Sequence, residues 1–406
     1  MSMEQYKQTS HQNVATPLGF YTGGMHCGLK YKRSDFGMIY SDVPASVAGM
    51  FTTNALQAAP LQVTKQVVYK TKYMQGIIVN SANANACTGK QGIENAKEMQ
   101  RLMAERFDID PSLVGVASTG VIGEQLRMEP IYKGVEELRL GRTQQHAIEF
   151  SQAILTTDTI TKTASYQIPI DGKMVTISGA AKGSGMIEPN MATMLAFITT
   201  DAQIDPTTLQ KALRIVTDQT FNCITVDGDT STNDTVLVLA NGLAGNDSLT
   251  EEHPDWSLFL SALRAISEDL AKMIAKDGEG ATKLIEVNVK EASSVQEARQ
   301  VAKTVVGSPL VKTAMFGKDG NWGRIIAAVG YSGVSLNMQR VKITIGDIVV
   351  LEDGEPKDYD EDALQMILEE PNIFIDIELG NGRSSGTAWG CDLTYEYINI
   401  NASYRS

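Results

Sequence analysis

The hydrophobic positions of this 406-residue chain follow two spacings that alternate from end to end. Short apolar runs are typical of buried strands, whereas apolar residues that recur every three or four positions are typical of helices. We expect strands at residues 76–80, 114–118, 194–198, 235–240, 284–289, 341–351, 373–379 and 391–398. We expect helices at residues 94–107, 132–140, 206–217, 256–275 and 294–303.

Two local signals add to this pattern. Asp171 and Gly172 form a favoured two-residue turn between extended runs, which predicts a hairpin over residues 164–180. Asp205 directly precedes the helix that we expect from Pro206, and it is a suitable N-cap. The alternation indicates the α/β class, and the antiparallel signals favour sheets packed between layers of helices.

The segment most informative about function is residues 182–201, KGSGMIEPNMATMLAFITTD. A glycine-containing loop leads to Ala192 and Thr193, and a predicted buried strand follows at once. If the chain cuts itself before Thr193, the freed threonine carries a hydroxyl nucleophile and an α-amine with a pKa of about 8. That pair is a known form of activated nucleophile. A β-branched residue also suits the start of any strand, so the residue types alone leave an ordinary structural role open.

Several stretches of the chain, in a fixed order from about residue 20 to the end, match one protein family. They are residues 182–195 of the segment above, NSANANACTG at 80–89, ASTGVIGE at 117–124, FNCITVDGDTSTND at 221–234, SPLVKTAMFGKDGNWGRI at 308–325 and the terminal INASYRS. Together they resemble the self-cleaving ornithine acetyltransferase family, also called the glutamate N-acetyltransferases. One departure is Gly320, where the family usually has proline, and this substitution loosens one turn.

The resemblance implies a fold and a chain organisation. The fold is an αββα-type sandwich, similar in outline to the N-terminal-nucleophile hydrolases but different in connectivity, with a smaller second α/β subdomain. Cleavage between Ala192 and Thr193 would give an alpha chain of residues 1–192 and a beta chain of residues 193–406, which form one intertwined fold. Two copies of each chain would form a heterotetramer.

The resemblance also implies the roles of individual residues. Thr193 is the nucleophile, and Thr119 and Gly120 form the oxyanion hole, for which we expect a glycine-containing turn after a strand. A lysine suits a substrate carboxylate, and a glutamate suits a substrate ammonium group. The substrate-binding positions of the family match Thr156, Lys182, Thr193, Glu279, Asn401 and Ser406. Judged without the resemblance, these residues have ordinary roles in turns, caps, solvated loops and a chain terminus.

The implied activity is transfer of the acetyl group from N-acetyl-L-ornithine to L-glutamate, in arginine biosynthesis, through an acetyl-Thr193 intermediate. We expect no metal or organic cofactor, because the ester carries the transferred group. Some family members also use acetyl-CoA as a co-substrate to acetylate glutamate, and the sequence does not distinguish the two kinds. One alternative is a self-cleaved threonine amidase or aminopeptidase of related fold. Another is a non-catalytic binding protein whose Ala192–Thr193 bond stays intact.

Composition indicates which partners and which cellular compartment are expected for this protein. The net charge of −13 argues against non-specific nucleic-acid binding, which requires many lysine and arginine contacts to phosphates. The four cysteines are scattered without a CxxC pair, which suits a reducing cytoplasm. The polar N-terminus is unlike a signal peptide, and no apolar run is long enough to span a membrane. We therefore expect a cytoplasmic enzyme with small-molecule substrates.

Three other patterns do not indicate a site of their own. Residues 382–386 fit G-x-S-x-G, but a strand pattern follows them where a nucleophile elbow needs a helix. Residues 227–234 resemble a calcium loop but have Thr232 at the glycine position, so we expect a hydrogen-bonded loop near the active site. The four histidines, His11, His26, His146 and His253, lack metal-ligand spacing.

Overall fold

The computed structural model describes residues 7–8, 13–188 and 194–403. The contacts divide the chain into two compact units. Unit 1 comprises Met1–Gly183, Asn190–Asn222 and Thr230–Leu270, and unit 2 comprises Ser184–Pro189, Cys223–Asp229 and Ala271–Ser406. Each unit contains residues from both sides of the predicted cleavage position. The predicted alpha and beta chains are therefore not the two structural units.

Within the described residues, unit 1 is built on one nine-stranded sheet. Its strands are β1 (Lys7–Gln8), β2 (Phe20–Met25), β3 (Phe36–Phe51), β4 (Tyr73–Asn83), β5 (Val114–Val121), β6 (Lys162–Ile170), β7 (Lys173–Lys182), β8 (Leu195–Thr200) and β10 (Thr235–Ala240). Its helices are α1 (Ala59–Gln66), α2 (Gly89–Phe107), α3 (Met128–Glu137), α4 (Gln144–Ala153), α5 (Pro206–Gln219) and α6 (Trp256–Lys276), the last of which continues into unit 2.

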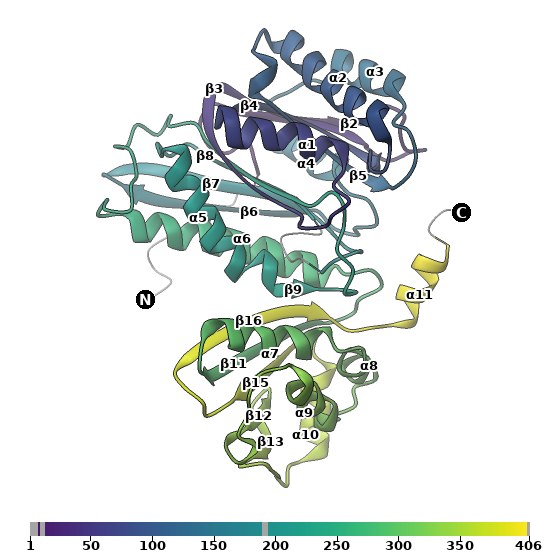
Figure 1. The fold of residues 1–406 in the computed structure, drawn as a ribbon, viewed down its shortest axis with the longest axis vertical. Helices are drawn as coiled ribbons and strands as arrows, with labels where there is room; N and C mark the ends of the chain where they lie inside the picture. The colour runs from purple at the N-terminus through teal and green to yellow at the C-terminus, as the bar shows by residue number, and fades with distance from the viewer. Residues whose placement is uncertain (1–6, 9–12, 189–193, 404–406) are drawn as a thin grey trace. The chain divides into compact units, whose positions relative to one another are not determined.

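The strands of unit 1 lie between helices (Figure 1). The strand order is β1-β6-β7-β8-β10-β3-β4-β5, and β2 pairs with β3. Helices α1 and α2 pack against β5, α5 packs against β3, and α6 lies next to Gly179 of β7. In Figure 1, α2 and α3 lie at the top of this unit and α6 lies below β6, with strands between them. This arrangement agrees with the expected layers of strands between helices.

Unit 2 is a smaller α/β unit with a seven-stranded sheet among its described residues, in the order β14-β13-β12-β15-β11-β16-β9. Its strands are β9 (Ile224–Thr225), β11 (Leu284–Ala292), β12 (Lys342–Ile345), β13 (Ile348–Glu352), β14 (Glu355–Pro356), β15 (Asn372–Glu378) and β16 (Ser384–Cys391). Its helices are α7 (Val295–Gly307), α8 (Pro309–Gly317), α9 (Trp322–Tyr331), α10 (Glu361–Glu369) and α11 (Tyr395–Ala402). Helix α7 packs against β11 and β16 and contributes buried valines and alanines to the core.

Most of the predicted elements are present, and two local predictions are confirmed in detail. Strands β6 and β7 form the expected hairpin, and Asp171 and Gly172 have φ values of 50° and 69°. Two positive φ angles are what the tight hairpin turn requires. The Asp205 side chain accepts hydrogen bonds from the backbone N–H groups of Thr207 and Thr208, so it caps α5 as expected.

Three predicted elements need correction. The strand expected at 341–351 is two strands, because a turn at Gly346, with φ of 62°, interrupts the apolar run. The helix expected at 132–140 is α3, which begins at Met128 and ends at Glu137. The strand expected at 391–398 is wrong: β16 ends at Cys391, and Thr394 caps helix α11 by accepting from Glu396 N–H.

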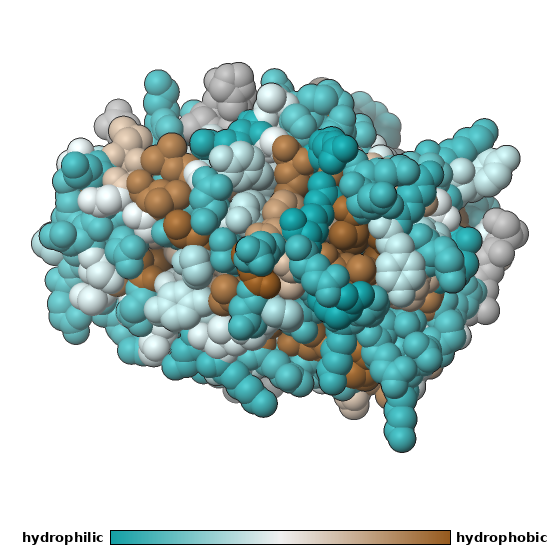
Figure 2. Space-filling view, turned by 90° about the horizontal axis from the view of Figure 1, so that it is seen from above, coloured by the Kyte–Doolittle hydropathy of each residue, from teal (hydrophilic) through white to brown (hydrophobic). Residues whose placement is uncertain are grey.

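The outer surface carries mostly hydrophilic side chains on the face that Figure 2 presents, with hydrophobic residues in separate groups between them. Scattered exposed apolar residues are normal for a folded protein. Among the described residues, no helix is both long enough and apolar enough to cross a membrane.

Candidate active site

Four of the predicted site residues lie in unit 1. Thr119 and Gly120 belong to β5, Lys182 is the last residue of β7, and Thr156 lies in the loop between α4 and β6. The Lys182 ammonium group lies 3.5 Å from the Thr119 hydroxyl oxygen, within reach of a long hydrogen bond. The structure thus brings a cationic side chain next to the predicted oxyanion hole.

The predicted oxyanion-hole pair has a different backbone setting from the one expected. Thr119 and Gly120 do not follow the strand in a turn, because β5 continues to Val121. The pairing of β4 with β5 shifts its register after Ala82. Gly120 has a φ of 133°, and a Cβ there would lie 2.1 Å from the carbonyl carbon of Ala82. An irregular strand pair, rather than a turn, therefore requires glycine at this position.

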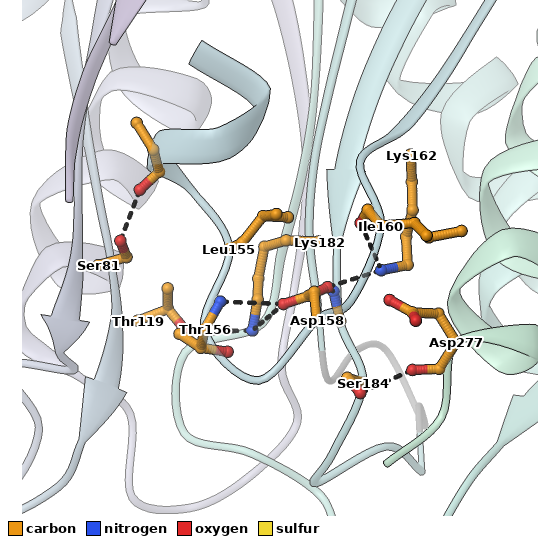
Figure 3. Close-up of polar contacts among 12 residues, drawn as sticks. Ser81, Thr119, Leu155, Thr156, Asp158, Ile160, Lys162, Lys182, Ser184 and Asp277 are labelled. Carbon is orange, nitrogen blue, oxygen red and sulfur yellow. Dashed lines mark hydrogen bonds and ion pairs between the residues drawn. The ribbon is translucent and has the colours of Figure 1, made fainter. Parts of the chain in front are cut away.

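Asp158 organises the surroundings of Lys182, as Figure 3 shows. Its Oδ1 lies 2.7 Å from the Lys162 ammonium group, and both of these side chains are fully buried. Its Oδ2 lies 4.0 Å from the Lys182 ammonium group. The carboxylate also accepts the backbone N–H groups of Thr156, at 3.0 Å, and Gly183, at 2.6 Å. Asp158 therefore ties the Thr156 loop to the residues around Lys182.

The charge state of Asp158 follows from these neighbours. Burial opposes ionisation, but the ammonium groups of Lys182 and Lys162 outweigh it and hold the pKa of the Asp158 carboxyl well below its ordinary value. Neither Asp158 nor Lys162 is among the site residues expected from the sequence. The only signal in the sequence is that Asp158, in the TTDT stretch, and Lys162 are four residues apart. The sequence does not show that both side chains are buried.

Lys30 is a second lysine beside this site that was not expected from the sequence. Its ammonium group donates to the Ser81 hydroxyl at 2.6 Å, the Leu155 carbonyl at 2.6 Å and the Ser34 carbonyl at 3.0 Å. Burial lowers the pKa of Lys30 to about 8, and the charge of Lys182 acts in the same direction. Lysine has three N–H donors, so Lys30 uses all of them to join three segments beside the Thr156 loop.

The start of β8 lies beside this cluster in the sheet. Leu195, the first residue of β8, is paired with Lys182 of β7 on one side and with Thr235 of β10 on the other. The backbone N–H of Thr235 donates to the carbonyl of Met194 at 2.9 Å. The chain therefore enters β8 beside Lys182, whose ammonium group is predicted to bind the substrate.

The second half of the loop at 227–234 belongs to unit 1 and contacts the same strand ends. The Asn233 side-chain amide donates to the carbonyl of Ser118 at 2.8 Å and to that of Ala84 at 2.6 Å. Ser118 directly precedes Thr119. The expectation of a hydrogen-bonded loop is confirmed for this half, which fixes the backbone before the predicted oxyanion hole.

Two predicted substrate-binding residues lie in unit 2. Glu279 is 5% exposed, and its carboxylate accepts the side-chain amide of Asn401 at 2.7 Å. The backbone N–H of Glu279 donates to the backbone carbonyl of Ser184 at 3.0 Å. A Cβ at Gly185 would lie 2.3 Å from the Glu279 carboxyl carbon, so glycine is required for the carboxylate to lie there. Asn401 belongs to helix α11, which positions its side chain close to the C-terminus of the chain.

Other acidic groups accompany Glu279 in unit 2. Burial, together with the nearby carboxylates of Asp229 and Glu279, raises the pKa of Asp227 to about 6. The Asp227 carboxylate accepts the backbone N–H groups of Ile187, at 2.8 Å, and Asp229, at 3.1 Å. Burial raises the pKa of Tyr397 to about 12, and the carboxylates of Asp227, Glu279 and Asp229 act in the same direction. This region favours a bound cation.

The remaining predicted positions cannot be placed. Ala192 and Thr193, at the predicted cleavage position, lie outside the described residues, and so does Ser406. Their predicted roles remain predictions.

One cluster of possible metal ligands was not apparent in the spacing of the histidines. Asp171, His253 and Asp255 place their ligand atoms within 4.8 Å of one another. His253 Nε2 lies 3.1 Å from the Asp171 carboxylate, and Asp255 accepts the backbone N–H of Asp171 at 3.0 Å. These contacts fasten the β6–β7 turn to the segment before α6, which explains the cluster without a metal ion.

Comparison with known proteins identifies the family. The model of the ArgJ family matches residues 21–406. This chain belongs to the ArgJ family. It is 58% identical over 394 residues to the arginine biosynthesis bifunctional protein ArgJ of Oceanobacillus iheyensis, with 97% of this chain and 96% of that protein covered. It is 56% identical over 393 residues to the protein of the same name from Geobacillus kaustophilus, with the same coverage of both chains.

A solved structure gives a further match. The crystal structure of the arginine biosynthesis bifunctional protein ArgJ from Bacillus halodurans is 57% identical and superposes with a TM-score of 0.52. The match covers 100% of that solved chain and 52% of this ArgJ family member. The family membership expected from the sequence motifs is confirmed.

Proposed function

We propose that this chain transfers the acetyl group of N-acetyl-L-ornithine to L-glutamate in arginine biosynthesis, through an acetyl-Thr193 intermediate. In maturation, Thr193 Oγ attacks the Ala192 carbonyl, the acyl group moves from nitrogen to oxygen, and water hydrolyses the ester. In catalysis, the freed α-amine acts as the base, and Thr119 and Gly120 stabilise the oxyanion. Ornithine then leaves, and glutamate takes the acetyl group.

The observation that carries this proposal is the entry to β8. Leu195, two residues after Thr193, is paired with Lys182, whose ammonium group lies 3.5 Å from the Thr119 hydroxyl. Thr193 is therefore only two residues away in the sequence from the strand partner of Lys182, whose ammonium group supplies a positive charge beside the predicted oxyanion hole. The names of the relatives, which are arginine biosynthesis proteins, support the same substrate class.

Cleavage would not separate the two pieces. The piece that begins at Thr193 supplies β8 and β10, which pair with β7 and β3 from the first piece. This pairing supports one intertwined fold made of residues 1–192 and 193–406. The heterotetramer, with two copies of each chain, rests on the family resemblance alone. The piece from Thr193 would hold 214 of the 406 residues, which is about half of the chain. The solved chain of the Bacillus halodurans relative matches a similar share of this chain, 52%.

The predicted binding residues keep the roles that the family resemblance implies. Thr156 and Lys182 lie with Asp158 in unit 1, and a lysine ammonium group suits a substrate carboxylate. Glu279 and Asn401 are hydrogen-bonded to each other in unit 2, and a carboxylate suits a substrate ammonium group. Ser406 completes the predicted set. A reducing cytoplasm suits the four scattered cysteines.

Intact-mass measurement with N-terminal sequencing tests the first half of the proposal. The wild-type protein is expected to give two chains, the second beginning Thr-Met-Leu-Ala, whereas Thr193→Ala is expected to stay whole. An active wild-type protein with a single uncut chain would remove the terminal amine from the mechanism.

Transfer kinetics test the second half and separate this proposal from its alternative. A covalent acetyl-enzyme predicts parallel lines in double-reciprocal plots, and glutamate should accelerate the release of ornithine. Glutamate-independent release would favour a self-cleaved amidase or aminopeptidase that uses water. Formation of N-acetylglutamate from acetyl-CoA and glutamate would show that this chain also has the acetyl-CoA-dependent activity that the family resemblance leaves open.

A further inference from the structure

Lys30 lies in the loop between β2 and β3, and a buried carboxylate holds this loop in place. The Asp35 side chain is fully buried and accepts the backbone N–H groups of Cys27 and Lys30, both at 2.7 Å. Its Oδ2 also lies 3.1 Å from His26 Nδ1. The backbone N–H of Ser81 donates to the Asp35 carbonyl at 2.8 Å, which joins the loop to β4. The backbone that carries Lys30 is therefore fixed.

The Lys30 ammonium group links two parts of unit 1 that hold predicted site residues. It donates to the hydroxyl of Ser81, and Ser81 of β4 is the register partner of Thr119 in β5 (Figure 3). It also donates to the carbonyl of Leu155, which directly precedes Thr156. One side chain thus connects the Thr156 loop to the pair of strands that carries Thr119.

The Thr156 loop is held from two sides. Arg33, from the same loop as Lys30, donates to the carbonyl of Thr156 at 3.3 Å. On the other side, Asp158 accepts the N–H of Thr156 and lies 4.0 Å from the Lys182 ammonium group. A binding group has to be held within about 0.5 Å of its productive position by such supporting contacts. Loss of Lys30 would free the end of the loop that precedes Thr156, while the contacts of Asp158 would remain.

We propose that Lys30 is a positioning residue that holds the Thr156 loop at the distance from Thr119 and Lys182 at which a substrate carboxylate is bound, a role that rests on the function proposed above. Protein groups use all three donors of its ammonium group. Lys30 therefore acts through the Thr156 loop and the strand pair, without touching the substrate. The ligand group is the carboxylate that N-acetylornithine and glutamate both carry.

The charge of Lys30 gives this role a characteristic dependence on pH. Burial lowers the pKa of Lys30 to about 8, with the charges of Lys182 and Arg33 acting in the same direction and those of Asp35 and Asp158 opposing them. Lys30 is therefore cationic below about pH 8 and increasingly neutral above it. A neutral amine makes weaker hydrogen bonds to carbonyls than an ammonium group does, so substrate binding should weaken as the pH rises through this range.

The test measures KM and kcat for both substrates, and L-ornithine binding by titration calorimetry, in variants of the full-length chain. In Lys30→Met, kcat/KM should fall by roughly 10- to 100-fold, the upper figure being the cost of a misplacement of about 1 Å. Most of the fall should appear in KM, and the Kd for L-ornithine should rise with it.

Lys30→Arg separates the charge from its titration. Arginine keeps its positive charge throughout this pH range, so this variant should bind substrate more tightly than Lys30→Met. The wild-type KM for N-acetylornithine should rise above about pH 8, and the rise should be smaller in Lys30→Arg. A residue that only supported the fold would not give this difference between the two pH profiles.

Lys283 provides the matched control in unit 2. It is 6% exposed, and its ammonium group donates to the carbonyls of Leu368 at 2.6 Å and Glu370 at 3.2 Å. Burial lowers the pKa of Lys283 as well. Lys283→Met removes a buried lysine whose hydrogen bonds lie at the end of α10. It should lower the thermal stability of the protein and leave KM and the Kd for L-ornithine at their wild-type values.

The outcomes separate this proposal from the proposed function. A wild-type KM and Kd in Lys30→Met would overturn the role of Lys30 and leave the proposed function in place. Equal increases in Lys283→Met would also overturn that role, because a general loss of stability would then explain both results. A wild-type chain that binds L-ornithine but does not transfer acetyl groups would overturn the proposed function, and calorimetry would still test Lys30. A wild-type chain that does not bind L-ornithine would overturn both.

Discussion

Two regions of this molecule hold buried acidic groups in opposite electrostatic settings. In unit 1, the carboxylate of Asp158 lies among ammonium groups, with Lys162 at 2.7 Å and Lys182 at 4.0 Å. In unit 2, the carboxylate of Asp227 lies near two further carboxylates, those of Asp229 and Glu279. The pKa of Asp158 is lowered, whereas burial and its neighbours raise the pKa of Asp227 to about 6.

The difference teaches that burial alone does not decide the charge of a group. Burial opposes ionisation of both aspartates. The ammonium groups next to Asp158 outweigh this effect, whereas burial remains the largest influence on the pKa of Asp227, and the neighbouring carboxylates add to it. The cation-rich region suits the carboxylate that every amino acid carries, and the acid-rich region suits an ammonium group.

The largest effect on stability is expected from Asp158→Asn, which removes the carboxylate that lies near Lys162 and Lys182 in the cation-rich region of unit 1. The substitution leaves the fully buried Lys162 without the carboxylate 2.7 Å away, so the free energy of unfolding should fall by about 3–5 kcal/mol. Because the folded pKa of Asp158 is lowered, its stabilisation is present above the unfolded pKa and is lost as the pH falls toward the folded value. Urea denaturation at pH 7 measures the loss.

An exposed ion pair gives the control for this substitution. Asp376 lies 2.7 Å from Lys290 in unit 2, at the same distance as the buried pair, but both side chains are partly exposed. Asp376→Asn should change the free energy of unfolding by about 1 kcal/mol or less. Equal losses for Asp158→Asn and Asp376→Asn would contradict the importance of burial.

The elements of the fold follow from the sequence where burial imposes a pattern. Strands such as β10 and helices such as α6 were predicted almost to the residue, because their apolar runs and stripes pack into the core. The pattern fails where apolar residues are not buried. Tyr395 and Ile398 suggested a strand, but they are 78% and 62% exposed on helix α11.

The candidate site was predictable only as far as its motifs extend. Thr119, Gly120 and Lys182 were identified from the family resemblance, and the structure brings Lys182 next to Thr119. Their supporting contacts were not predictable, because Lys30 is 125 residues away from its partner Leu155 in the chain. Nothing in the sequence links these two positions, so only the fold could reveal the pair.

The second largest effect is expected from Lys182→Met, which removes the charge beside Thr119 but keeps a long side chain. A charge-assisted hydrogen bond to a substrate carboxylate is worth about 1.5–3 kcal/mol, so kcat/KM should fall by roughly 10- to 150-fold for N-acetylornithine and for glutamate alike. Steady-state kinetics with each substrate measures the fall. A variant with unchanged kcat/KM would exclude a role for Lys182 in binding.

Glu279→Gln should have a smaller and more selective effect. Glutamine keeps the hydrogen bond to Asn401 but removes the negative charge. The KM for N-acetylornithine, whose side chain carries an ammonium group, should rise by about 10-fold, equivalent to about 1.4 kcal/mol. The KM for glutamate should change less. Equal changes for the two substrates would show that Glu279 does not distinguish the cationic side chain.

An effect of opposite sign, a gain in stability, is expected from Asp227→Asn. Because the folded pKa of Asp227, about 6, exceeds its ordinary value of 3.8, the protonated side chain favours folding at low pH, and this contribution is lost as the pH rises through 6. Asparagine removes the charge, and its oxygen can still accept the N–H groups of Ile187 and Asp229. At pH 7.5 the variant should therefore be more stable than the wild type by roughly 1–2 kcal/mol, and the gain should shrink at pH 5. Urea denaturation at both pH values measures it, and a gain that does not depend on pH would contradict the assignment of the raised pKa to Asp227.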